Sequence, residues 1–204
     1  MTREGFRQAA TFFSDVAAEV RPDQWDTLAL GEWSVRELVA HASRTFASVH
    51  DWASPQRTAS RVEVPSPAGF YVRMFAPGGG NAGVMEQARE SAQMLEGDIA
   101  TQVRAARADA LAVLIEISDH HPVASRAGGM RFIDWLATRT VELTVHGLDL
   151  AAAIGSTAAP GEAALRTTFG VLSEIAIAQH KAPGLLLALT GRHPLPTGFS
   201  LMAD

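Results

Sequence analysis

The 204-residue sequence contains no cysteine. Without thiols the chain has no disulfide, no thiolate nucleophile and no thiolate metal ligand. A metal ion would therefore be bound by histidine and carboxylate side chains. Thiol chemistry would need a thiol supplied from outside the chain.

Lysine is almost absent as well, because Lys181 is the single lysine beside sixteen scattered arginines. With a net charge of −5, the sequence lacks the clustered positive charge that binds phosphates, so no nucleic-acid partner is expected. The scarcity of lysine and the abundance of alanine together indicate a GC-rich bacterial genome.

Long hydrophobic runs are missing too. The N-terminal MTREGFRQ lacks the apolar segment of a secretory signal, and the stretches 110–117 and 185–189 are too short to cross a bilayer. We therefore expect a soluble, cytoplasmic protein with no membrane partner. The 47% hydrophobic and 19% charged residues are typical of globular chains. The length predicts a single domain over 1–204.

Helical periodicity dominates the sequence, and no alternating strand pattern is visible. Ser34 and Glu37 have the spacing of a capping box at a helix start, and Asn81 is placed to cap a later helix. We predict an all-α fold, a bundle with a four-helix core and additional short helices. The predicted helices are 2–20, 34–53, 81–108, 131–154, 160–180 and a short one between Pro183 and Gly191.

The segment 54–82 is rich in proline, glycine and serine and would be an unusually long connection within a compact domain. Such connections are often functional, so this one is a candidate lid over a site. Alternatively, its apolar residues form a satellite cluster packed on the bundle; these are Phe70, Tyr71, Met74 and Phe75.

The helix predicted over 131–154 carries a polar stripe. Glu142 and His146 are four residues apart and share one face, which Arg139 and Asp149 continue at three-residue steps. Because burying unpaired ionisable groups is costly, the stripe needs partners. One interpretation is self-pairing, Arg139 with Glu142 and His146 with Asp149. The other is a pair of metal ligands presented from one helix, completed from a facing helix.

His41 is the candidate third ligand, because it lies beside the apolar stripe of the helix predicted over 34–53. A core-edge histidine bonded to a carbonyl oxygen is the alternative. His50 faces the opposite side of that helix and should not join. The remaining histidines lie in loops or near helix ends and are expected to be solvated; these are His120, His121, His180 and His193.

Three segments together resemble the N-terminal domain of mycothiol-dependent maleylpyruvate isomerases, within the DinB-like superfamily. They are Trp33-Ser-Val-Arg-Glu-Leu-Val-Ala-His41, Arg139-Thr-Val-Glu-Leu-Thr-Val-His-Gly-Leu-Asp149 and Leu189-Thr-Gly-Arg192. Their order and spacing match over roughly residues 5–200, although Leu148 stands where the family commonly has a bulky aromatic residue.

The resemblance implies a DinB-like helical bundle that binds one divalent metal ion, usually zinc, through His41, Glu142 and His146. Imidazole and carboxylate ligands also suit nickel and iron. The implied activity is that of a metal-dependent enzyme with mycothiol or a similar thiol as nucleophile and a small electrophile as substrate. The isomerases have a further C-terminal domain and this chain ends at Asp204 without one, so S-transfer and cis-trans isomerisation both remain open.

Two further residues are candidate catalytic residues. Asp149 would orient His146 from behind, although a plain exposed aspartate is an equal alternative. Arg139 would bind a substrate carboxylate, a role for which Arg131 and Arg73 are also candidates. A non-catalytic metal-binding or small-molecule-binding bundle, and a metal-free interaction module, are the competing functions. A homodimer is compatible with the sequence.

Overall fold

The computed structural model describes residues 1–52, 57–76 and 83–202, and it confirms the predicted all-α bundle. In chain order the elements are α1 (Thr2–Ala18), β1 (Leu28–Leu30), β2 (Trp33–Ser34), α2 (Val35–Trp52), α3 (Pro67–Met74), α4 (Val84–Gln93), α5 (Ile99–Glu116), β3 (Pro122–Ser125), β4 (Gly128–Arg131), α6 (Phe132–Ile154), α7 (Glu162–Ala178) and α8 (Ala182–Leu189).

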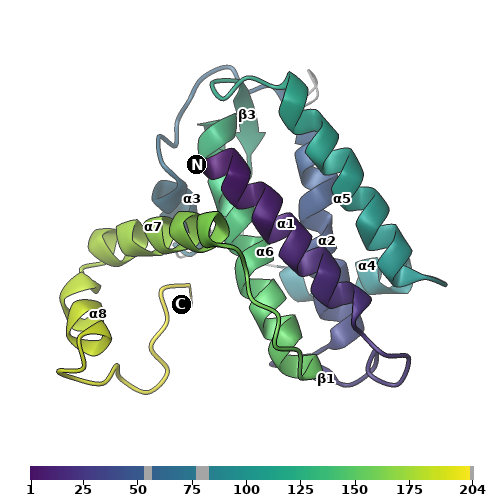
Figure 1. Ribbon diagram of the computed structural model, residues 1–204. Helices are drawn as coiled ribbons and strands as arrows, with labels where there is room; N and C mark the ends of the chain where they lie inside the picture. The colour runs from purple at the N-terminus through teal and green to yellow at the C-terminus, as the bar shows by residue number, and fades with distance from the viewer. Residues whose placement is uncertain (53–56, 77–82, 203–204) are drawn as a thin grey trace.

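Four long helices, α1, α2, α5 and α6, pack around one apolar core (Figure 1). Phe13 of α1, Phe46 of α2, Leu114 of α5 and Leu136 of α6 are at most 1% exposed. Burying side chains of this size stabilises the fold by about 1.5–3 kcal/mol each. The 23-residue α6 runs through the middle of the bundle and contacts both α1 and α2. Side chains of α6 that face α2 are therefore held on a closely packed helix.

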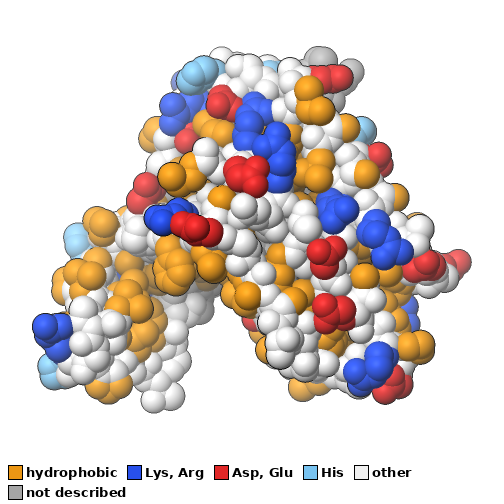
Figure 2. Space-filling model, viewed as in Figure 1, with side chains coloured by type: hydrophobic (Ala, Val, Ile, Leu, Met, Phe, Trp, Pro, Cys, Tyr) orange, Lys and Arg blue, Asp and Glu red, His pale blue; other side chains and the backbone are white. Residues whose placement is uncertain are grey.

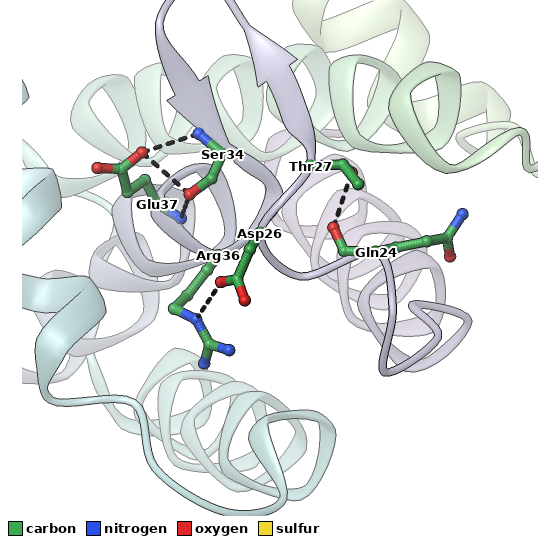
Figure 3. A network of polar contacts seen from close by, with 6 residues as sticks. All are labelled: Gln24, Asp26, Thr27, Ser34, Arg36 and Glu37. Carbon is green, nitrogen blue, oxygen red and sulfur yellow. Dashed lines mark hydrogen bonds and ion pairs between the residues drawn. The ribbon is translucent and has the colours of Figure 1, made fainter.

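The start of α2 is fixed by the predicted capping box (Figure 3). The Ser34 hydroxyl accepts a hydrogen bond from the Glu37 amide at 3.2 Å, and the Glu37 carboxylate accepts one from the Ser34 amide at 2.8 Å. Nearby, Arg36 pairs with Asp26 at 3.3 Å. These contacts join the helix to the chain before it and so set the position of His41, two turns further on.

Two short antiparallel hairpins, β1–β2 and β3–β4, accompany the helices, although the sequence shows no alternating strand pattern. The first has strands of three and two residues, too short to show an alternating pattern. The second contains Gly128 and Gly129. A β-carbon on Gly129 would overlap the carbonyl oxygen of Arg61, so glycine lets the segment before α3 lie against this strand.

Two further boundaries differ from the prediction. The helix predicted over 81–108 is two helices, α4 and α5, because Gly97 has a φ of +66° and the Asp98 side chain caps α5 by accepting from the Thr101 amide. The apolar stretch 110–117 is mostly the end of α5 rather than a separate segment. Asn81, the expected cap, lies outside the described residues.

The segment 54–82 also contains a helix that we did not predict. Pro67 occupies the first turn of α3, and Ser66 caps the helix by accepting a hydrogen bond from the Gly69 amide at 3.1 Å. Phe70, Tyr71 and Met74 are buried, as the satellite-cluster interpretation expected.

The C-terminal part of the chain leaves the bundle (Figure 1). Helix α7 packs on α1, α3 and α6, whereas α8 has no buried residue and its helix contacts are with α7. Among the described residues, no helix is both long and apolar enough to cross a membrane.

Candidate metal centre

Helices α2 and α6 bring together the three predicted ligands. One possible ligand atom from each of His41, Glu142 and His146 lies within 4.8 Å of the other two. The two imidazole rings meet edge to face, with centroids 5.0 Å apart and an interplanar angle of 88°. The four-residue spacing on α6 puts Glu142 and His146 on the face that α2 covers, which is how two distant segments form one cluster.

The Trp33 indole, from strand β2, lies over this cluster. It is 8% exposed, and its ring centroid is 4.7 Å from that of His41 and 6.3 Å from that of His146. The first hairpin therefore contributes an apolar wall that keeps water from both imidazoles.

His41 is held in the form that binds metals. Burial, followed by the positive charge of His146, lowers its pKa to about 4, so the ring is neutral at pH 7. Its Nδ1 is buried and has no hydrogen-bond partner among the residues that the structure describes. No carbonyl oxygen accepts from that nitrogen, and an unpaired buried imidazole nitrogen is the kind of atom that a metal ion would satisfy.

Glu142 is ionised in the same cluster. Burial alone would raise its pKa, but the hydrogen bond to His146 and the charges of Arg139, His146 and His41 outweigh burial and hold the pKa at about 2. Its Oε1 also lies 3.1 Å from the hydroxyl of Tyr71, which is 3.0 Å from the Thr138 carbonyl oxygen. Burial, with the charge of Glu142, raises the pKa of Tyr71 and keeps this hydroxyl protonated.

His146 lies between two carboxylates. Its Nε2 is 3.6 Å from Glu142 and its Nδ1 is 3.2 Å from Asp149. Burial would lower its pKa, but the hydrogen bonds to Asp149 and Glu142 raise it to about 9. Asp149 thus fixes the Nδ1 side of the ring and leaves Nε2 directed at the cluster.

Arg139 lies one turn before Glu142 but does not form the ion pair that the self-pairing interpretation expected. Its guanidinium is stacked between Phe70 and Trp135, 5.5 and 5.6 Å from the ring centroids, and its Nε donates to the Thr138 hydroxyl at 3.1 Å. Among the described residues it has no carboxylate within ion-pair distance.

The two alternative arginines are already engaged elsewhere. Arg131 pairs with Asp134 at 2.5 Å, and Arg73 donates to the carbonyl oxygens of Ala127 and Glu63. Both bonding patterns join neighbouring segments of the fold, so of these three candidates Arg139 is the one beside the cluster.

The other five histidines stay apart from the cluster, as predicted. His50 is exposed and lies 3.4 Å from Asp51. Sequence reasoning did not foresee the contact of Tyr71 with Glu142. Its only signal was that the chain's one tyrosine lies among aromatic residues of the long 54–82 segment.

Comparison with known proteins gives one family. The sequence profile described as "Mycothiol maleylpyruvate isomerase N-terminal domain" matches residues 6–151, which include α2, α6 and all three candidate ligands. Searches of the curated proteins and of the solved structures found no match. The matched range ends before α7 and α8.

Proposed function

The chain belongs to the mycothiol maleylpyruvate isomerase N-terminal domain family, whose general fold is DinB-like, and we propose that it is a metal-dependent enzyme. In this proposal His41, Glu142 and His146 hold one divalent ion, zinc in the first instance. A low-molecular-weight thiol such as mycothiol is the nucleophile, and a small electrophile is the substrate. The reaction is S-transfer or cis-trans isomerisation.

The convergence of two imidazoles and one carboxylate carries the proposal. Two His ligands and one carboxylate leave a fourth position open, the pattern of catalytic rather than structural zinc sites. The donor set fits, because the His41 imidazole is neutral, the Glu142 carboxylate is ionised, and the buried Nδ1 of His41 has no hydrogen-bond partner among the described residues. His146, whose pKa is raised to about 9, would give up a proton when its Nε2 binds the ion. A divalent ion at this position would favour the thiolate form of a bound thiol.

The remaining side chains have supporting roles. Asp149 orients His146 through Nδ1, and Tyr71 donates a hydrogen bond that orients Glu142. Trp33 excludes water from the imidazoles. Arg139, stacked between two rings and lacking an ion-pair partner among the described residues, would bind an anionic group of the electrophile. Because the chain has no cysteine, the thiol comes from outside.

Elemental analysis of the purified protein tests the metal. About one equivalent of a divalent ion is expected, lost in His41→Ala and retained in His50→Ala, a matched control because His50 is an exposed histidine on the same helix. Metal-free protein under all loading conditions would overturn the proposal.

A second measurement tests the chemistry. The metal-loaded protein is incubated with mycothiol and a panel of electrophiles, and the products are examined for thiol adducts and for isomers. Metal binding without turnover of any pair would favour the alternative of a non-catalytic metal-binding bundle.

A further inference from the structure

Two arginines from distant parts of the chain meet at one side-chain oxygen. Arg44 of α2 and Arg126, in the turn between β3 and β4, both donate to Oε1 of Gln87, on α4, at 3.0 and 3.1 Å. Gln87 is uncharged, so the contact brings two positive charges together without neutralising either one.

Neither guanidinium has a carboxylate within ion-pair distance among the described residues. The negative charge of Glu90, one turn along α4 from Gln87, acts on Arg44 from beyond ion-pair distance. Burial lowers the pKa of Arg44, and the positive charge of Arg126 lowers it further. Among the described residues, Glu90 is therefore an opposite charge near Arg44 that forms no ion pair with it.

The donors also outnumber the acceptors. Each guanidinium has five N–H groups in a planar fork, and one amide oxygen can accept only about two of them. Arg44 is half-buried, so water does not freely reach its remaining donors. A bidentate oxyanion matches the guanidinium fork in shape and supplies an ion-pair partner.

We infer that Arg44 and Arg126, held together by Gln87, form an oxyanion-binding site for the carboxylate or phosphate group of a small molecule. Arg44 is three residues after His41 on α2, so both side chains lie on one side of that helix. The charge of Arg44 also acts on His41. The site therefore lies beside the candidate metal centre and is separate from it.

This anion site adds a substrate-binding group to the proposed function. Only the identity of its ligand, an anionic group on the electrophile, rests on that proposed function. If the electrophile binds at the metal centre, an oxyanion on it would be held by Arg44 and Arg126 in addition to Arg139. The pair would then select anionic substrates over neutral ones of the same size.

Isothermal titration of the full chain with succinate and with inorganic phosphate tests the site at low ionic strength, where charge contacts are least screened. Saturable binding of at least one anion is expected, weakened about tenfold or more in Arg44→Gln and in Arg126→Gln. Arg104→Gln is the matched control, because Arg104 is exposed and donates to the Thr101 hydroxyl, and this variant should bind the anions as the wild type does. Stronger binding of succinate would identify a carboxylate site, and stronger binding of phosphate a phosphate site.

No saturable binding of either anion, or undiminished binding in both Arg44→Gln and Arg126→Gln, would overturn the inference. Arg126 is exposed on a turn, so its variant should fold even where that of Arg44 does not. Repeating the titration after EDTA treatment and dialysis separates anions bound by arginine from anions bound by metal, since only the former persist. Metal content measured on the same samples distinguishes failure of this site from failure of the proposed function.

Discussion

The candidate metal centre and the α7–α8 arm differ in which kind of side chain they expose to water. At the candidate metal centre, charged side chains lie inside, with Glu142 and His146 only 21% and 17% exposed, and each has defined partners. In the α7–α8 arm, large apolar side chains lie outside (Figure 2). The most exposed are Leu189 at 68%, Ile177 at 65%, and Phe169 and Leu186, both at 62%.

The contrast shows that the first region is more closely packed than the second. The buried charges are held by α6, which packs along α1 and α2 over most of its length, whereas α8 contributes no buried residue. The family profile covers the first region and ends at residue 151, before the second. A site that must hold three ligands in register needs the rigid support that only the first region provides.

The largest expected effect comes from removing one apolar side chain in each region. Phe13→Ala should lower the free energy of unfolding by about 3–5 kcal/mol, because Phe13 is fully buried on α1. Leu189→Ala should change it by less than about 0.5 kcal/mol, because its side chain is mostly solvated already. Urea unfolding followed by circular dichroism measures both. A loss of 2 kcal/mol or more in Leu189→Ala would contradict the contrast and would mean that α8 packs on a partner.

The second-largest expected effect is a loss of metal affinity when Asp149 is changed. Asp149→Asn should weaken binding of the metal ion about 10–100-fold, because the residue that orients His146 loses its charge while keeping its shape. Asp51→Asn is the control, since Asp51 makes the same kind of contact with a histidine, His50, outside the cluster. Competition with a chromogenic chelator measures the affinity. Equal affinities in wild type and Asp149→Asn would leave Asp149 with no orienting role.

The sequence predicted the core of this region because its signals are local. The four-residue spacing of Glu142 and His146 defines a helix face, and Ser34 and Glu37 mark where α2 begins. His41 was a candidate because it lies beside the apolar stripe of its helix, and the family resemblance then placed it in one site with Glu142 and His146. No local pattern says which helices face each other.

The features that were missed depend on contacts between distant segments. Tyr71 reaches Glu142 across 71 positions, and Gln87 joins Arg44 to Arg126 from a third element. The hairpins consist of strands of two to four residues, below the length at which periodicity can be recognised. One of the two interpretations of the polar stripe paired Arg139 with Glu142, but aromatic faces hold Arg139 instead, which the spacing along α6 alone did not reveal.

The pH dependence of metal-free protein is a further test of the buried charges. His146, with its pKa raised to about 9, stabilises the fold fully below pH 6.5, and this contribution is lost as the pH rises toward 9. His41, lowered to about 4, and Glu142, lowered to about 2, act in the opposite sense, because the unfolded chain binds their protons first as the pH falls. The contribution of the cluster should therefore be greatest near pH 6.5.

Urea unfolding of EDTA-treated protein between pH 4 and pH 9 measures this profile. Subtracting the profile of His146→Gln isolates the alkaline side, where the wild type should release about one more proton on unfolding than the variant does. Parallel profiles of the two proteins above pH 6.5 would show that His146 is not held protonated by Glu142 and Asp149.

The smallest expected effect comes from replacing a helical glycine with alanine, which should change the free energy of unfolding in opposite directions in the two regions. A β-carbon on Gly147, next to His146 on α6, would lie 2.5 Å from the ring of Phe12 on α1. Overpacking of this kind costs about 1–3 kcal/mol, and the helix gains up to about 1 kcal/mol when alanine replaces glycine. Gly147→Ala should therefore destabilise the protein by about 1 kcal/mol.

Gly170, on α7, is the matched position, because it is helical and exposed and a β-carbon there meets nothing within 4 Å. Without the clash only the gain in helix stability remains, so Gly170→Ala should stabilise the protein by about 0.5–1 kcal/mol. Urea unfolding of both variants, at one pH and with matched metal content, measures the difference. Effects of the same sign would contradict the contrast, since it requires that α6 be closely packed against α1 beside His146 and that this face of α7 be open to solvent.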